Sequence, residues 1–272
     1  MPGKLMGKAM SPLICLLLYA LIVLRFCLVS FPVGRLEAGL WILLPSCLLY
    51  PYHLDFKITF WLKFIQCYLD HNSPLYRFLS KGKVLRLMAV ITSVTASFII
   101  FYFFYSLKMD WKAFAVMALA SLALSFLTGS KKQAYVPFLA EDLKERFARY
   151  LPPFYLALLC AAVMVFLHVR WLRLVPMEFV FIEAERAVTA ADISFRTLRI
   201  ILRHMVSLEY FTEHLLAFYY LRPLGMAAFF LSSLGASFSI LLFCKRIFEI
   251  AFTFFDKLGQ KSGRQNEEAD HE

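Results

Sequence analysis

Charged side chains are scarce in this sequence. They make up only 18% of the 272 residues, whereas apolar residues make up 61%. Soluble domains contain roughly 45–50% apolar residues. A soluble fold of this length cannot bury so much apolar surface, because much of any folded surface must face water. The composition therefore excludes an ordinary soluble domain and predicts an all-α protein that spans a membrane.

The sequence also lacks the usual motifs of metal and disulfide chemistry. None of the six cysteines forms a Cys-x-x-Cys pair, and most of them lie inside or beside apolar runs, where cysteines pack as small hydrophobic residues. Glu209, Glu213 and His214 do not have His-Glu-x-x-His spacing. His204 and His214 lie about 15 Å apart along a helix, too far to share one metal ion. We therefore expect no metal ion and no cofactor, and no catalytic residue is assigned.

A soluble stretch long enough to form a nucleic-acid-binding domain is missing as well. The net charge is +10, but the cations lie mainly in short segments that flank apolar runs. There they set the orientation in the bilayer and meet anionic headgroups. A nucleic-acid surface needs a contiguous basic face on a folded domain. We expect no nucleic-acid partner; the expected partners are the lipid bilayer and other membrane subunits or a second copy of the chain.

Apolar runs of about 20 residues, the length that crosses a bilayer core, predict a single domain of about six transmembrane helices over residues 1–258. The second run is the weakest, because Pro45 and Pro51 interrupt it, and we expect it to be kinked or re-entrant. Residues 259–272 are polar and are predicted to form a disordered cytoplasmic tail. The six runs lie near residues 11–32, 36–54, 87–107, 111–129, 151–169 and 224–244.

Ionisable residues are absent from the middle of the four clear runs between Leu87 and Cys244. Proton- and sodium-coupled carriers usually place such residues at mid-membrane depth. Their absence disfavours an ion-coupled transporter and leaves a pore or a lipid-handling protein open.

The distribution of cations predicts the orientation. If the first and last segments share one side, eighteen of the 29 cations lie on that side and ten lie opposite, with Arg25 inside the first run. The richer side is cytoplasmic by the positive-inside rule. The sequence has no Asn-x-Ser/Thr sequon, which is consistent with a bacterial protein. We therefore expect six spans in a cell inner membrane with both termini in the cytoplasm.

Residues 178–222 hold the richest set of functional groups and are predicted to form an extramembrane amphipathic helical segment. Arg196, Arg199 and Arg203 recur at three and four residues, so one helical face carries all three. Arginine binds carboxylates and phosphates in a bidentate way. The stripe is therefore a candidate site for anionic headgroups or an acidic partner, or else a solvated face of a helix on the membrane surface. The opposite, anchoring face is expected to hold Leu198, Ile201, Met205, Leu208 and Leu215.

The acidic and histidine side chains of the same segment allow a third interpretation, a metal or hydrolytic site. They are Glu178, Glu183, Glu185, Asp192, His204, Glu209, Glu213 and His214.

Small residues recur every four positions in the last apolar run. Ala228, Ser232 and Ala236 form a small-xxx-small face, which lets another helix approach closely. We expect this face to pack against a neighbouring helix or a second copy.

The leading functional hypothesis is a non-catalytic subunit or accessory factor of an inner-membrane assembly that serves secretion or the cell envelope. A channel or uncoupled transporter is the alternative. An intramembrane enzyme that uses the Glu and His groups of residues 178–222 is the third hypothesis.

Overall fold

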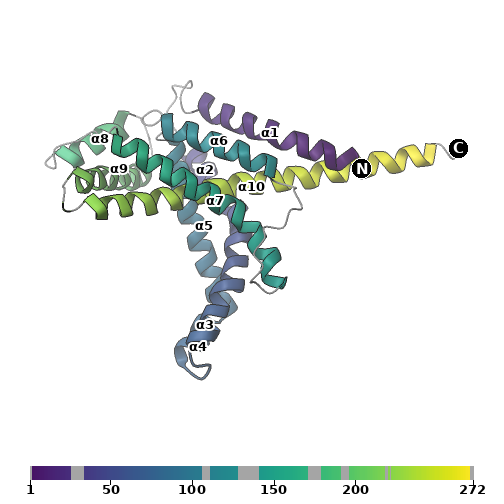
Figure 1. Cartoon of the computed structure of the whole chain (residues 1–272), viewed down its shortest axis with the longest axis horizontal. Coiled ribbons are helices and arrows are strands. Elements are labelled where there is room, and N and C mark those ends of the chain that lie inside the picture. Colours follow the sequence, from purple (N-terminus) through teal and green to yellow (C-terminus); the bar gives the residue numbers. More distant parts are fainter. Residues whose placement is uncertain are drawn as a thin grey trace. The chain divides into compact units, whose positions relative to one another are not determined.

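The computed structural model describes residues 2–25, 34–105, 111–127, 141–170, 179–190, 196–217, 220 and 222–269. Every regular element in these ranges is a helix (Figure 1). The all-α prediction is therefore confirmed for the described part of the chain. The elements are α1 (Pro2–Val23), α2 (Arg35–Phe56), η2 (Lys57–Trp61), α3 (Leu62–Tyr68), α4 (Pro74–Leu79), α5 (Gly82–Tyr105), α6 (Trp111–Leu127), α7 (Glu141–Arg170), α8 (Val180–Ala190), α9 (Arg196–Ala217) and α10 (Arg222–Ala269).

Three of the described helices are long and apolar enough to cross a membrane. The segments are Gly82–Phe104, Arg149–His168 and Arg222–Phe254, with 23, 20 and 33 residues. They cover three of the predicted spans. Pro12–Val23 and Trp111–Leu127 are apolar but shorter, and the α2 segment does not meet the same criteria. The chain thus has the helices of a membrane protein, and the count of six spans is not confirmed.

The chain divides into two compact units, where the sequence had suggested one helical domain. The first unit comprises Met1–Val33 and Phe103–Glu272, and the second comprises Gly34–Tyr102. The second unit is a helical pair with its own internal contacts.

In the second unit, small polar side chains join α2 to α5. The hydroxyl of Ser46 donates to Oγ of Ser97 at 2.8 Å. Ala89, Ser93 and Ala96 are buried on α5. The backbone of α2 stays helical through Pro45 and Pro51, the two residues for which we expected a kinked or re-entrant segment. A π-helical turn, η2, follows, so the irregularity lies after the prolines.

In the first unit, α7 and α10 pack against each other in opposite directions. The start of the apolar part of α7 lies beside the middle of α10, because Nζ of Lys245 donates to the carbonyl oxygen of Arg149. The end of α7 lies near the start of α10, where the rings of His168 and Phe229 stack at 4.2 Å. The contacts at both ends therefore fix the pair as antiparallel.

A buried polar cluster joins α1, α6 and α10 in the same unit. The hydroxyl of Tyr19 lies 2.7 Å from Oγ of Ser121 and donates to the carbonyl oxygen of Met117 at 3.2 Å. The Cys244 side chain lies beside both hydroxyl groups. The ring of Tyr19 also packs edge-on against Phe114 at 5.2 Å. Because each polar group has a partner, the cluster can be buried at little cost.

Helix α10 is longer than the sequence suggested. Its backbone is helical to Ala269, over most of the segment 259–272 for which we expected disorder. That segment contains no proline, and its Lys, Gln, Glu and Ala residues favour helix. The apolar part, Arg222–Phe254, has 33 residues, whereas about 20 cross a bilayer core. Part of α10 must therefore tilt or extend beyond the core.

Candidate functional site

Helices α8 and α9 form a hairpin in the segment that the sequence marked as rich in functional groups. The two helices pack against each other, and each buries a row of small and aliphatic side chains with the spacing of one helical face. These positions are almost fully buried, so the hairpin has a packed interior of its own. They are Val180, Ala184 and Val188 on α8, and Leu198, Leu202 and Val206 on α9.

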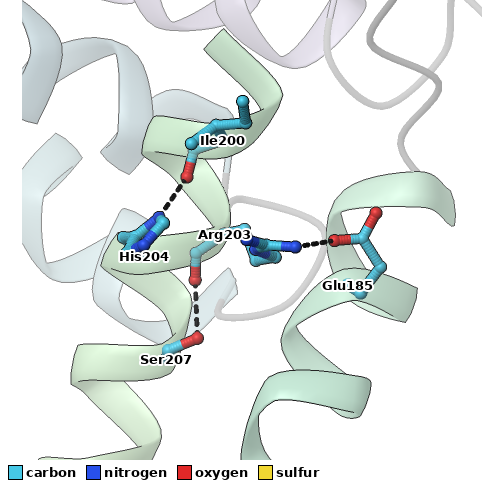
Figure 2. A network of polar contacts seen from close by, with 5 residues as sticks. All are labelled: Glu185, Ile200, Arg203, His204 and Ser207. Atoms are coloured by element: carbon cyan, nitrogen blue, oxygen red, sulfur yellow. Dashed lines mark hydrogen bonds and ion pairs between the residues drawn. The ribbon is translucent and has the colours of Figure 1, made fainter. Parts of the chain in front are cut away.

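An ion pair joins the two helices of the hairpin at its polar side. Nη1 of Arg203 lies 3.1 Å from Oε2 of Glu185 (Figure 2). The backbone carbonyl of Arg203 accepts a hydrogen bond from Ser207, and Nδ1 of His204 lies 2.7 Å from the carbonyl oxygen of Ile200. Arg203 is therefore engaged within the chain, and Glu185 offsets its charge.

The predicted arginine stripe is not uniform. Arg196 is exposed at the start of α9, Arg199 is half-buried, and Arg203 is paired with Glu185. Asp192, one of the acidic side chains of this segment, lies outside the described residues. Binding of an anion by all three arginines remains a prediction, and Arg196 is the most accessible of them.

The predicted anchoring face of α9 is only partly buried within the chain. Leu198 is buried as expected, but Leu208 is 66% exposed, and Ile201 and Met205 are only half-buried. The residues that α9 buries are set by the neighbouring α8, α7 and α10, which a single-helix pattern does not reveal. The side turned away from these helices is a stripe at three- and four-residue spacing, here called the outer stripe. It consists of Arg196, Ile200, His204, Leu208 and Phe211, all exposed.

A buried carboxylate connects the hairpin to the helical bundle. Oε1 of Glu213 lies 3.2 Å from Nε2 of His168 on α7, and the two side chains are only 10% and 15% exposed. This distance suits an ion pair, although the angles do not make a well-aligned hydrogen bond. The His168 ring stacks on Phe229 of α10. Glu213 and His168 therefore bring α9 and α7 together beside α10.

Helices α9 and α10 approach each other closely at Gly225, a residue without a predicted role. A Cβ atom built on Gly225 would lie 2.8 Å from the backbone nitrogen of Leu216 and 2.9 Å from the carbonyl carbon of Leu215. Only glycine fits there without movement of the backbone. A glycine at the second position of the predicted last span was the only sequence signal, and it does not indicate a partner.

The predicted small-residue face of α10 is not the face that packs within the chain. Ser232 is exposed and donates to the carbonyl of Phe229 on its own helix. Ala228 and Ala236 are half-buried. The buried small residues are instead Ser233 and Ser237. The face formed by Ala228, Ser232 and Ala236 therefore remains a predicted contact for another molecule.

The described carboxylates and histidines do not assemble into a reactive centre. Glu183 pairs with Arg186 at 2.6 Å, and His214, like His204, places Nδ1 beside a carbonyl of its own helix. No three metal-ligating side chains come together in the described ranges. Burial, with the charges of Glu209, Glu213 and Glu183, raises the pKa of Tyr210, so its phenol stays protonated. The arrangement is suited to binding and packing.

The chain was compared with protein-family models, curated proteins and solved structures, and none of them matches it. Function must therefore be inferred from the residues and their geometry.

Proposed function

We propose that this protein is a non-catalytic subunit or accessory factor of an inner-membrane assembly, and that it contacts its partner through the outer stripe of α9. The supporting observation is the exposure of Ile200, Leu208 and Phe211, at 43%, 66% and 41%, on a hairpin whose interior is already packed. Exposed apolar patches beside charged groups mark protein or membrane contacts. Arg196 begins the same stripe and adds an anion-binding group.

The carboxylates of the same segment are paired within the chain, which also supports a binding role. In the described part of residues 178–222, Glu183, Glu185 and Glu213 each have a cationic or imidazole partner. Two of these pairs, Glu185 with Arg203 and Glu213 with His168, join separate helices. Their structural role supports the subunit hypothesis over the intramembrane enzyme.

We further propose that both termini are cytoplasmic and that the α8–α9 hairpin lies on the opposite side. The contact between Lys245 and Arg149 supports this topology, because it brings two cation-rich segments to one end of the α7–α10 pair. Reporter fusions after Lys132 and at the C-terminus should both report the cytoplasm. A fusion that reports the outside would contradict the topology.

Purification from native membranes in mild detergent tests the function. The wild-type chain should retain a stable membrane-protein partner, and the double variant Arg196→Gln, Leu208→Gln should lose it while inserting at normal levels. The matched control is Arg222→Gln with Leu224→Gln, a pair of exposed residues outside the outer stripe, which should retain the partner. Retention of the partner by the double variant, or conductance of the purified chain alone in liposomes, would contradict the proposal.

The face formed by Ala228, Ser232 and Ala236 is a second proposed contact, with another subunit or a second copy. Ser232→Leu adds bulk at an exposed position and should disrupt assembly without disturbing the chain's own fold. Unchanged assembly and function in Ser232→Leu would show that this face contacts lipid.

A further inference from the structure

In the second unit, the chain turns between α3 and α5, and this turn contains no buried residue. Ile65 on α3 and Leu85 on α5 are the last buried side chains on either side. Every residue from 66 to 84 is exposed or half-buried. This turn therefore takes no part in the packed interior of its unit, and its side chains are available to the surroundings.

Cations dominate the charge around this turn. Residues 57–86 contain six cations and one acid, Asp70. The only acid is used locally, because its Oδ1 accepts a hydrogen bond from the backbone nitrogen of Asn72 at 3.1 Å. Five of the cations are exposed, and none of the five has an ion pair within the described ranges. They are Lys63, Arg77, Lys81, Lys83 and Arg86.

Large apolar side chains are exposed beside these cations. Phe64 and Tyr68 are 54% and 74% exposed on α3, and Leu75 and Phe78 are 54% and 56% exposed on α4. The rings of Phe64 and Tyr68 lie 4.6 Å apart, so they form one aromatic surface. These four apolar residues and the five exposed cations are here called the basic tip.

The turn that carries the basic tip is built to hold its shape. Oγ of Ser73 accepts a hydrogen bond from the backbone nitrogen of Tyr76 at 3.1 Å and so caps α4, with Pro74 at its first position. His71 packs edge-on against the ring of Tyr76 at 4.6 Å. The exposed side chains are thus displayed from a capped, ordered turn.

We propose that the basic tip binds anionic phospholipid headgroups of the bilayer in which the chain is inserted. Exposed Lys and Arg beside Phe, Tyr and Leu are the combination that binds at the boundary between headgroups and acyl chains. The cations attract the lipid phosphates, and the apolar side chains enter the acyl boundary. An anionic leaflet attracts each nearby Lys or Arg, and an excess of such residues is characteristic of cytoplasmic segments. This site is separate from the proposed partner contact on α9.

Titration of the full-length protein in mild detergent with dioctanoyl phosphatidylglycerol tests the proposal. The variant Arg77→Gln, Lys81→Gln, Lys83→Gln, Arg86→Gln should bind this lipid on the order of 100-fold more weakly at low salt. Dioctanoyl phosphatidylcholine should bind the wild type and the variant equally and weakly. Two controls accompany the variant. Arg77→Lys, Lys81→Arg, Lys83→Arg, Arg86→Lys keeps every charge, and Arg186→Gln, Arg222→Gln, Lys257→Gln removes three exposed cations outside both proposed surfaces; both should bind as the wild type does.

Several outcomes would overturn the assignment. Wild-type affinity in the first variant, or an equal loss in the control that removes cations elsewhere, would show that the basic tip is not the site. Competition by inorganic phosphate at the same concentration as the lipid would show a site for free anions. Loss of a bound protein with unchanged lipid affinity would show a protein contact.

A salt titration keeps the test decisive if the first variant does not accumulate. Binding of phosphatidylglycerol by the wild type should weaken as salt rises from roughly 0.05 to 0.5 M, because salt screens exposed charges. Binding that does not respond to salt would contradict the role of the cations.

Discussion

At one end of the antiparallel α7–α10 pair, Lys245 donates to a backbone carbonyl, and its nearest carboxylate, Glu249, lies one turn away on the same helix at 3.8 Å. At the other end, Glu213 comes from a third helix to meet His168. At the first end, therefore, one hydrogen bond crosses from α10 to α7, and the ion pair lies within α10. The second depends on side chains that only the tertiary fold brings together, so the account predicts that substitutions there cost more.

The largest expected effect is at His168. His168→Phe keeps a ring against Phe229 but leaves the Glu213 carboxylate buried without its partner, which should lower the free energy of unfolding by about 3–5 kcal/mol. Adding Glu213→Gln removes the buried charge and should recover at least half of the loss. Thermal melting in mild detergent measures both, and an unchanged melting temperature in His168→Phe would show that the pair does not hold α9.

Gly225→Ala should come next, with a loss of about 1–3 kcal/mol, because the added methyl group overlaps the backbone of α9 near Leu216. Gly235→Ala is the matched control on the same helix, since nothing lies within 4 Å of its Cβ position. The control should be neutral or gain about 0.5–1 kcal/mol from the better helix former. Equal melting temperatures for the two variants would refute the close approach.

Tyr19→Phe tests the buried cluster near the Lys245 end. The variant loses the hydroxyl that bonds to Ser121 and to the carbonyl of Met117, and a loss of about 0.5–1.5 kcal/mol is expected. Tyr155→Phe, at a position 60% exposed, should change the melting temperature little. If Tyr19→Phe lowered the free energy of unfolding as much as His168→Phe does, the two ends of the α7–α10 pair would not differ as proposed.

The smallest effect is expected for Glu249→Gln, with a loss of about 0.5 kcal/mol or less. Its cationic neighbours, Lys245 and Arg246 at 3.8 and 3.5 Å, lie on the same helix, and pairs within one helix contribute little. The Lys245 contact with the carbonyl of Arg149 should remain. A loss above about 1 kcal/mol would mean that this carboxylate holds α7 and α10 together, contrary to the comparison.

Most of what the sequence could predict came from the composition of single segments. Long apolar runs predicted the helices that contain Gly82–Phe104, Arg149–His168 and Arg222–Phe254, because span length and hydropathy are properties of one segment. The predicted spans over residues 36–54 and 111–129 are not confirmed, since α2 does not meet the criteria for a span and the helix Trp111–Leu127 has only 17 residues.

The site could be predicted only in part, for a physical reason. An arginine periodicity identified the face of α9 that holds Arg196, but it could not show that Glu185 of another helix pairs with Arg203. The exposure of Leu208 likewise depends on where α7, α8 and α10 lie. Gly225 and His168 carry no signal by themselves, because their roles arise from partners distant in the sequence.

The central claim is that the two ends of the α7–α10 pair lie on opposite sides of the membrane. Single cysteines introduced as Arg196→Cys and Lys257→Cys, in a background without the six native cysteines, report this directly. In cells whose outer membrane has been opened and whose inner membrane, the proposed location, is intact, a membrane-impermeant maleimide should label the cysteine at position 196. The cysteine at position 257 should react only after the inner membrane is permeabilised. Labelling of both before permeabilisation, or of neither, would contradict the claim.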